Sequence, residues 1–382
     1  MDLSKLDLDA LCADGFTERK AQQYLREMAG EDEKDIFDPD YRTWAHSHGF
    51  FAESAYAFGL TENNYEDYLS DYDYYRLWPL NGWQRIWIND KLTLNALTQD
   101  SPLARYVPEY YYYVEQDRLL ALCGSGYADG FEGFLDTLRA KGTFACKPCN
   151  GVWAQGFHRL DYHNGEFFID KEPTTTDGLR TFLDENKNAV ITEFLRPEAS
   201  LAAINPLIHT IRVLTLNPTG VDPVPSLTYL RFALESGETG SGSNYQIPSK
   251  AGVGDINLSV DVKTGEFGNS KIVYANEVVD CPMHPVSGAP MEGVIPQWDE
   301  ILTMVKELAL KVNACEYLGF DACLTDKGPM IMEINSHSGP KYIQVNTPVL
   351  TDPIAGPYFK AKLAALDALT PEQKERRRRI AR

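Results

Sequence analysis

The sequence predicts an α+β fold that follows a mainly helical N-terminal region, and three observations lead to this prediction. Residues 1–80 carry apolar residues at helical spacing, with Leu3, Leu6 and Leu11 near one face. From about residue 84, short β-branched runs alternate with helical stretches. These elements lack the regular β-α-β spacing that would indicate a doubly wound parallel sheet.

The elements after residue 84 are predicted from apolar patterns and turn residues. Residues 85–99 predict the end of a strand, a turn and a helix. Further strands are predicted within residues 142–160, 165–170, 189–195, 209–216, 227–234 and 256–269. A turn is predicted at Asn164–Gly165. The best helical pattern spans 298–320, with one apolar stripe formed by Ile301, Val305, Leu308 and Val312. Two strands, 321–326 and 329–335, follow it and are joined by a turn at Lys327–Gly328.

Composition excludes several classes of protein. The 382 residues include 36 Lys and Arg against 55 Asp and Glu, a net charge of −19, which argues against nucleic-acid binding through a basic surface. Hydrophobic residues make up 43%, too many for a disordered chain. No apolar run approaches the roughly 20 residues of a membrane helix, and the N-terminus lacks the pattern of a signal peptide. Seven dispersed cysteines then indicate reduced thiols and a cytoplasmic protein.

The strongest chemical signal lies near the end of the predicted sheet, in GFDACLTDKGPMIMEIN. Asp321 opens one strand, and Glu333 and Asn335 lie two residues apart on the next. Residues i and i+2 share one face of a strand, so a hairpin would bring the three oxygen-bearing side chains together. Such hard oxygen ligands suit Mg²⁺, which completes its shell with waters and phosphate oxygens.

A second signal is Lys147 in FACKPCNGVWAQGF, where an apolar strand leads into a loop with Gly151 and Gly156. Glycines let backbone amides approach a phosphate, and the lysine supplies a point charge. The segment is neither a Walker loop nor a Rossmann fingerprint. Lys91 in NDKLTL is a third element.

Two further segments carry polar residues at the ends or in the middle of apolar strands. In VITEFLRPE, backbone groups around Phe194 and Leu195 could pair with an adenine edge, and Glu193 or Glu198 could reach an exocyclic amine or ribose. Arg212 lies within the β-branched run HTIRVLTL, where a guanidinium is costly unless it meets an anion.

Together these segments resemble the ATP-grasp superfamily. The resemblance is closest to the sugar-transfer-associated ATP-grasp group, with a looser likeness to the teichuronopeptide synthesis family, and runs from about Tyr68 to Gln344. The segments that carry it are YLSDYDYYRLWPLN, NDKLTL, ACKPCNG, TEFL, AAINPLIHTIRV, HPVSG, VIPQW and GFDACLTDKGPMIMEIN.

The resemblance implies an ATP-grasp fold, in which two α+β lobes hold ATP, and it implies ATP and Mg²⁺ as cofactors, with two ions and Mn²⁺ as the alternative metal. The implied nucleotide contacts are Lys91, Lys147, Gly151, Glu193, Phe194, Leu195 and Glu198. The implied catalytic residues are Arg212, Arg231 and Lys147, and the implied metal ligands are Asp321, Glu333 and Asn335, with Glu333 bridging. The implied substrate contacts are His209, His337, Ser338 and Lys341.

The sequence departs from this group in three places. His209 stands where the group usually has Asn, Gly252-Val253-Gly254 replaces Gly-Gly, and the hinge lacks the usual Gln-His, with Glu198 nearby instead. These departures bear on ribose contacts and on the choice of acceptor.

The division of the chain that the resemblance implies has four parts. They are an N-terminal helical region (1–80), an ATP-grasp N-terminal part (81–196) with a lid at about 140–196, a catalytic lobe (197–350) and a C-terminal helix with a basic tail (351–382).

The implied activity is that of an ATP-dependent carboxylate–amine ligase that forms an amide through an acyl-phosphate and releases ADP and phosphate. Its partners would be a small-molecule carboxylate and an amine, on an amino acid or a sugar precursor of a surface polysaccharide or related metabolite. A kinase that phosphorylates a hydroxyl and an inactive nucleotide-binding scaffold are the alternatives. The sequence does not indicate an oligomeric state.

Three other features have an ordinary structural interpretation. The Tyr- and Asp-rich residues 65–83 favour packing between helices over a carbohydrate-stacking surface. Cys146 and Cys149 are spaced like a zinc or redox pair, but no second pair accompanies them. The basic run Arg376–Arg379 predicts a solvated, frayed helix end rather than a membrane contact.

Overall fold

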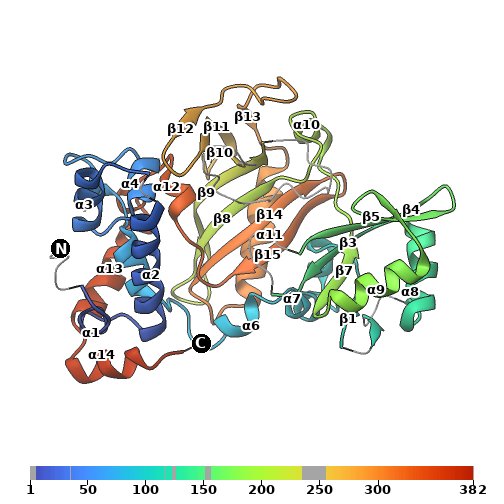
Figure 1. Ribbon diagram of the computed structural model, residues 1–382, viewed down its shortest axis with the longest axis horizontal. Coiled ribbons are helices and arrows are strands. Elements are labelled where there is room, and N and C mark those ends of the chain that lie inside the picture. The colour runs from blue at the N-terminus through green and yellow to red at the C-terminus, as the bar shows by residue number, and fades with distance from the viewer. Residues whose placement is uncertain are drawn as a thin grey trace.

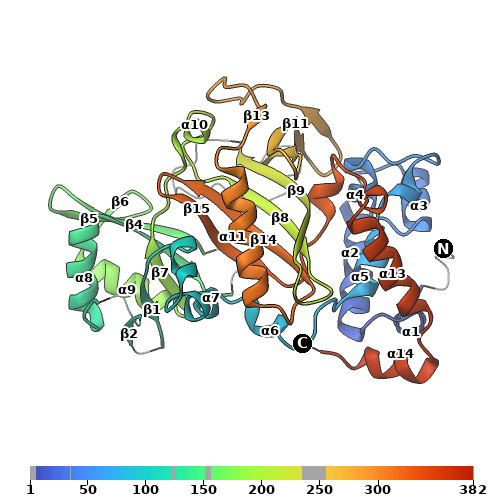
Figure 2. The same cartoon turned by 180° about the vertical axis from the view of Figure 1, so that it is seen from behind.

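The centre of the molecule is an antiparallel sheet of eight strands, seen in a computed structural model that describes residues 6–34, 36–116, 118–122, 126–150, 156–234 and 255–381. Its order is β12-β11-β10-β9-β8-β14-β15, and β13 pairs with β11. The strands are β8 (Thr210–Leu216), β9 (Val224–Ala233), β10 (Asp255–Val260), β11 (Glu266–Val273), β12 (Val278–Asp280), β13 (Gly293–Val294), β14 (Tyr317–Thr325) and β15 (Gly328–Asn335). Helix α11 (Trp298–Lys311) covers one face, as its apolar stripe predicted (Figure 2).

A second antiparallel sheet forms a smaller lobe beside the first (Figure 1). Its order is β2-β1-β7-β3-β4-β5-β6, and the strands are β1 (Tyr110–Val114), β2 (Leu119–Ala121), β3 (Thr143–Pro148), β4 (His158–His163), β5 (Glu166–Ile169), β6 (Glu172–Thr174) and β7 (Ala189–Glu193). Helices α8 (Gly130–Lys141) and α9 (Thr176–Glu185) bury Phe134, Leu138 and Leu179 against it. Because β1, β2 and α8 belong to this lobe, it begins well before residue 140.

Short helices flank the two sheets along the chain. Three of them, α6 (Arg85–Ile88), α7 (Lys91–Thr98) and the 3₁₀ turn η3 (Pro102–Tyr106), lead into β1, and α10 (Ala199–Ala202) lies between β7 and β8. The strand end predicted at residues 85–88 is therefore wrong, because these residues form the single turn α6. The helix predicted after it is confirmed: Asp90 caps α7 by accepting the Thr93 amide.

Both ends of the described chain meet in a helical layer on the other side of the central sheet (Figure 1). The N-terminal elements are α1 (Leu8–Ala13), α2 (Glu18–Lys34), α3 (Pro39–Ser47), α4 (Ala52–Ala57), η2 (Tyr65–Asp67) and α5 (Asp71–Leu77). The C-terminal elements are α12 (Lys341–Gln344), η4 (Val349–Thr351), α13 (Ala355–Asp367) and α14 (Pro371–Arg378). Tyr24, Tyr72 and Tyr75 pack edge to face between α2 and α5, so the Tyr-rich stretch is largely core.

The basic end of the chain is docked, which corrects the prediction of a frayed tail. Thr370 and Gln373 form a capping box at the start of α14. Arg377 donates to the carbonyl groups of Gly15, Arg76 and Trp78, and its neighbour Arg378 forms ion pairs with Asp9 and Glu18. Among the described residues, no helix is long and apolar enough to cross a membrane.

Candidate active site

The β14–β15 hairpin brings the three predicted metal ligands together. Asp321 and Glu333 are directly opposed in the register of the two strands, so their side chains share one face. Asn335 lies on the same face, and its Nδ2 donates to Asp321 Oδ2 at 3.3 Å. Two carboxylates and an amide oxygen on one face of the two outermost strands are a donor set that fits Mg²⁺, which takes its other ligands from water and phosphate.

Lys91 reaches this face from the other direction. It is the first residue of α7, its side chain is buried, and its Nζ lies 2.9 Å from Glu333 Oε2. Its backbone amide donates to the Cys149 carbonyl at 2.9 Å, which ties α7 to the end of β3 in the small lobe. Burial raises the pKa of Glu333; Lys91 opposes that rise and the Asp321 carboxylate adds to it.

The Arg212 guanidinium, which lies in an apolar strand, is paired with the Asp321 carboxylate. It is opposed to Asp321 across β8 and β14, and its Nε and Nη2 contact the two oxygens of that carboxylate. Its Nη1 donates to Ser338 Oγ at 2.6 Å. Burial disfavours the guanidinium charge, but Asp321 outweighs it and raises the pKa of Arg212.

Lys147 lies on β3, where the small lobe approaches the central sheet. Burial, followed by repulsion from Lys91, lowers the pKa of Lys147 to about 8. Cys323 on β14 and Glu333 on β15 act on it in the opposite sense, so the lysine faces the hairpin. The two lysines predicted to bind phosphate are thus neighbours. Gly151, predicted in the same loop, lies outside the described residues.

Residues 193–198 form the crossing between the two sheets. The Glu193 amide donates to the Glu109 carbonyl within the small lobe, while its carboxylate contacts Lys327 Nζ in the β14–β15 turn. Phe194 has the Arg159 guanidinium 4.9 Å from its ring centroid, and Leu195 is half-buried beside it.

Glu198 is engaged as a helix cap. Its carboxylate accepts the Ser200 amide at 2.8 Å and begins α10, and the bonds from Ser200 hold the pKa of Glu198 below its ordinary value. Its own amide donates to the Leu324 carbonyl in the central sheet. In this structure the side chain is therefore engaged by its own helix.

The predicted substrate residues divide into two groups. His209 is 1% exposed and its Nε2 accepts the Leu324 amide at 3.1 Å, so it is a core residue here rather than a substrate contact. Burial lowers the pKa of His209 to about 3, which keeps the ring neutral. Arg231 is also buried, on β9, one strand beyond Arg212.

His337, Ser338 and Lys341 continue the chain from the metal-ligand strand toward the N-terminal helices. The His337 ring stacks on Tyr74 with centroids 4.5 Å apart, and neither ring nitrogen has a hydrogen-bond partner among the described residues. Burial, together with the charges of Lys20 and Arg377, lowers the pKa of His337. Lys341 Nζ lies 4.0 Å from Glu53 Oε2 on α4.

The sequence did not reveal the residues that fix the end of β15. Buried Asn81 donates to the carbonyls of Tyr317 and Ser336, each at 2.6 Å, and accepts the amides of Glu316 and Tyr317. Asn89 accepts the Ser336 amide at 2.8 Å. Asn81-Gly82 and Asn89-Asp90 have the composition of turns, a signal that indicates a loop and not its partner.

The Cys146–Cys149 pair is part of the core. Both thiols are free and buried, and burial raises the pKa of each to about 12. Within the described ranges, no group of three or more His, Cys, Asp and Glu side chains could hold a metal. The candidate ligands Asp321, Glu333 and Asn335 do not count as such a group, because the third of them offers an amide oxygen.

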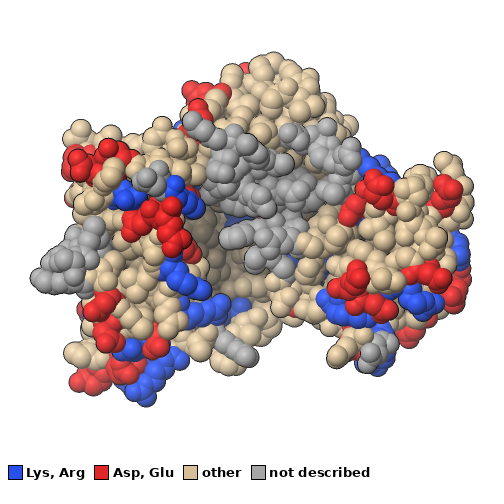
Figure 3. All heavy atoms as spheres, in the orientation of Figure 1, with Lys and Arg blue, Asp and Glu red and all other residues tan. Residues whose placement is uncertain are grey.

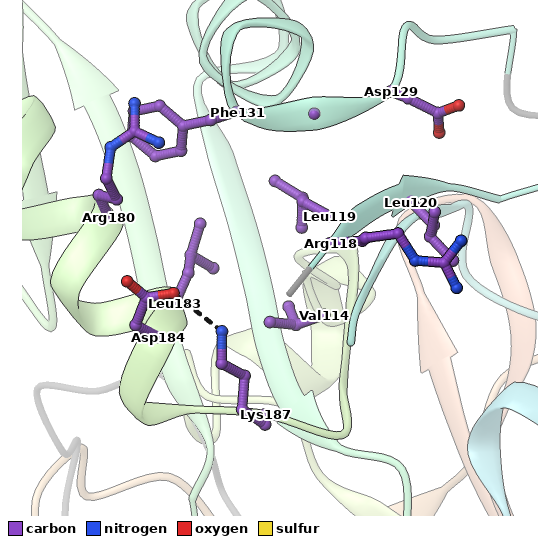
Figure 4. Close-up of a pocket in the computed structure, with 11 residues that line it drawn as sticks. Val114, Arg118, Leu119, Leu120, Asp129, Phe131, Arg180, Leu183, Asp184 and Lys187 are labelled. Carbon is purple, nitrogen blue, oxygen red and sulfur yellow. Dashed lines mark hydrogen bonds and ion pairs between the residues drawn. The ribbon is translucent and has the colours of Figure 1, made fainter. Parts of the chain in front are cut away.

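A pocket of about 500 Å³ opens elsewhere, on the small lobe between β2, α8 and α9 (Figure 4). The Arg180 guanidinium lies 4.0 Å from the Phe131 ring centroid, and Lys187 pairs with Asp184 at 2.8 Å on its rim. None of the residues predicted from the sequence to bind nucleotide, metal or substrate lines it.

Comparisons with known proteins give one family and several similar solved structures. Residues 86–355 match the family model described as sugar-transfer associated ATP-grasp. Among solved structures, the ATP-grasp ligase PsnB is 13% identical with a TM-score of 0.37, over 75% of this chain and 61% of that one. D-alanyl-alanine synthetase A from Vibrio cholerae is 11% identical with a TM-score of 0.41, over 74% of this chain and 66% of that one. D-alanine–D-alanine ligase from Bacillus anthracis is 13% identical with a TM-score of 0.37, over 78% of this chain and 71% of that one. The chain thus spans about three fifths of PsnB. No curated protein matches it.

Proposed function

The chain belongs to the sugar-transfer associated ATP-grasp family, and on that premise we propose that it is an ATP-dependent ligase that joins a carboxylate to an amine. The observation that carries the proposal is the meeting of Lys91, Lys147 and Arg212 with the oxygen ligands of the β14–β15 hairpin. Such a cluster of cations and hard ligands is what transfer of a phosphoryl group requires.

In the proposed site, Lys91 and Lys147 bind phosphate oxygens, and Asp321, Glu333 and Asn335 hold Mg²⁺. When bound, ATP supplies the phosphoryl group and Mg²⁺ neutralises its charge. Residues 193–195 flank the adenine, a role supported by their position at the crossing between the lobes. We propose two metal ions, the number that the family resemblance implies.

The reaction we propose has two steps. A substrate carboxylate takes the phosphoryl group and becomes an acyl-phosphate, with release of ADP. An amine then attacks the acyl carbon, forms the amide and releases phosphate together with its proton. Arg212 is the cation that we propose to stabilise the charge developing in both steps, and its bond to Ser338 Oγ would orient the guanidinium. Arg231 is the second candidate for this role.

The small lobe is the proposed lid. Its sheet approaches the hairpin through β3, and closure over the nucleotide would exclude water, which would otherwise hydrolyse the acyl-phosphate. The substrates we propose are a small carboxylate and a small amine, on an amino acid or a precursor of a surface polysaccharide. The cytoplasm is the proposed location, which the free thiols of the described cysteines support.

The test is product analysis with a metal-ligand variant. Purified protein, ATP and Mg²⁺ are incubated with pairs drawn from amino acids, amino sugars and uronic acids, and ADP, AMP and products are identified by mass spectrometry. We expect ADP and an amide, and a loss of 10²-fold or more in rate for Glu333→Gln, on the order seen when one such contact is removed. Glu266→Gln, an exposed change on β11, is the matched control.

Three results would contradict the proposal in different ways. AMP in place of ADP would exclude the acyl-phosphate route. A stable phosphorylated product with no amine consumed would indicate a kinase. Full activity of Glu333→Gln would remove the metal assignment.

A further inference from the structure

We infer that Arg19, Lys20 and Arg85 form an anion-binding subsite beside the candidate active site, and that it takes the phosphate group of a phosphorylated co-substrate. The role as a co-substrate site rests on the proposed function, whereas the binding of an anion does not. All three residues precede the segment that matches the family model, residues 86–355.

The three cations surround one buried indole. Arg19 and Lys20 come from the start of α2, and Arg85 is the first residue of α6. Their charged groups lie 5.8, 5.7 and 5.5 Å from the centroid of Trp78, which follows α5. No two of these charges can therefore be more than about 12 Å apart, because each lies within 6 Å of the same ring centroid.

Within the described part of the chain, none of these three cations forms an ion pair. Arg19 donates to the Ala381 carbonyl at 3.2 Å, Lys20 to Gln23 Oε1 at 2.8 Å and Arg85 to the Gly82 carbonyl at 2.7 Å. The Nε of Arg85 is buried and has no partner there at all. Burial and the neighbouring Arg19 lower the pKa of Lys20 to about 8, as repulsion between uncompensated charges should.

Carboxylates are available close by but are bound elsewhere. Arg76, two residues before Trp78, has Asp14, Asp73 and Asp367 within ion-pair distance. Glu27 acts on Lys20 from further away, and its two oxygens accept bonds from Gln23 and Tyr75. In a chain of net charge −19, three cations around one ring that have no carboxylate partner among the described residues leave room for an anion from solution.

The subsite is joined to the metal-ligand strand. The Arg85 carbonyl accepts from Ser336 Oγ at 3.2 Å, and Ser336 directly follows Asn335. Two residues before Arg85, Trp83 is 70% exposed and offers an aromatic face to a ring attached to the anion. Figure 3 shows Lys and Arg side chains along the margin of the hollow between the N-terminal helices and the central sheet.

Phosphate is the anion that this chemistry favours. Two guanidinium groups and an ammonium group can meet two negative charges and several oxygens at once, which a single carboxylate cannot do. The reacting carboxylate already has a proposed partner in Arg212. A second basic cluster therefore serves a second anionic group, and a sugar phosphate would place its phosphate on the cations and its ring near Trp83.

The experiment measures phosphate binding without turnover. The nucleotide site is first saturated with Mg²⁺ and a non-hydrolysable ATP analogue, so that added inorganic phosphate cannot enter it, and phosphate is then titrated by calorimetry. We expect saturable binding by the native protein and a Kd raised about tenfold in Lys20→Gln and in Arg85→Gln. Arg378→Gln, which removes a cation of the same corner already paired with Asp9 and Glu18, should leave the Kd unchanged.

Arg19→Gln keeps the test valid if the half-buried variants unfold, because Arg19 is exposed and should also weaken binding. Absence of saturable binding by the native protein, or an equal Kd in all variants, would overturn the inference. The co-substrate role is tested by ADP release with sugars and their phosphate esters. Lys20→Gln should raise KM about tenfold for the esters alone, with kcat unchanged. If phosphate binds but no carboxylate–amine pair supports ADP release, the proposed function fails and the anion site stands.

Discussion

Arg212 shows how a single residue depends on its surroundings. A guanidinium in the middle of a β-branched strand is stable because Asp321 faces it and Ser338 accepts a third bond. The same bonds fix the direction of its charge. The sequence alone could indicate that Arg212 needed an anion, but not which one.

The first prediction concerns the shape of this cation. Arg212→Lys keeps the charge but loses the planar fork, so it cannot contact both oxygens of Asp321 and Ser338 together. We expect kcat for ADP release to fall about 10²-fold. Steady-state kinetics with a thermal-unfolding control measures this, and a variant that folds normally with native kcat would show that Arg212 only supports the fold.

The second prediction concerns His209 and pH. Its pKa is about 3 in the folded chain and about 6.5 in an unfolded one, so between these values the unfolded state binds a proton that the folded state does not. Stability from this residue is complete above pH 6.5 and declines as pH falls, by up to about 1.4 kcal/mol per pH unit.

His209→Asn removes the titrating group and keeps a polar side chain at the position. Urea unfolding between pH 7 and pH 4.5 should therefore show a smaller loss of unfolding free energy in His209→Asn than in the native protein. Parallel pH profiles for the two proteins would mean that His209 is protonated in the folded state or exposed to solvent.

The relative positions of residues could be predicted from the sequence where local geometry decides them. Glu333 and Asn335 share a face because they are two apart on a strand, and the turn at Lys327–Gly328 brings Asp321 opposite. His209 could not be assigned in this way, because its partner is a backbone amide more than a hundred residues away. The role of Glu198 as the N-cap of α10, where its carboxylate accepts the Ser200 amide, was likewise not predicted from the sequence.

At the scale of elements, the loop of residues 78–90 organises the site. It holds the end of β15 through Asn81 and Asn89 and leads directly into α7 and Lys91. The sequence did not predict that this loop holds the end of β15. Its residues Arg85–Ile88 have β-branched and aromatic character, yet they form a helical turn because tertiary contacts override so short a preference.

The third prediction concerns this loop. Asn81→Ala leaves the carbonyls and amides that Asn81 satisfies without partners in a buried position. We expect a loss of about 2–3 kcal/mol in unfolding free energy, the cost of several unsatisfied groups. Denaturant titration measures it, with the exposed Asn63→Ala as the control. A change of less than about 0.5 kcal/mol would mean that water replaces the amide.

At the scale of the whole molecule, the two termini stabilise one another. Arg377 on α14 donates to Gly15, Arg76 and Trp78, more than 290 residues away along the sequence. The sequence could predict helices at both ends and two α+β lobes between them. It could not predict the order of strands in either sheet or the docking of α13 and α14, because those depend on pairings between distant segments.

The fourth prediction tests this docking. Arg377→Met keeps the length of the side chain but removes three hydrogen bonds to buried carbonyls. We expect a fall of about 2–3 kcal/mol in unfolding free energy. Arg376→Met, the exposed neighbour, removes the same charge and should have little effect. Equal effects of the two variants in denaturant titration would mean that charge, and not docking, is what the tail contributes.

The contact between Lys91 and Glu333 has a consequence for how charge moves when ligands arrive. The Lys91 ammonium is bound to the carboxylate that we propose as a metal ligand. The Glu333 carboxylate, in turn, is bound to the ammonium that we propose to hold a phosphate. Arg212 and Asp321 repeat the pattern one strand away. If a metal–nucleotide complex binds here as proposed, it would exchange partners with both ion pairs and change the local charge little. A metal ion binding alone would lie beside the displaced Lys91 and Arg212 cations, and a nucleotide binding alone would lie beside the displaced Glu333 and Asp321 carboxylates.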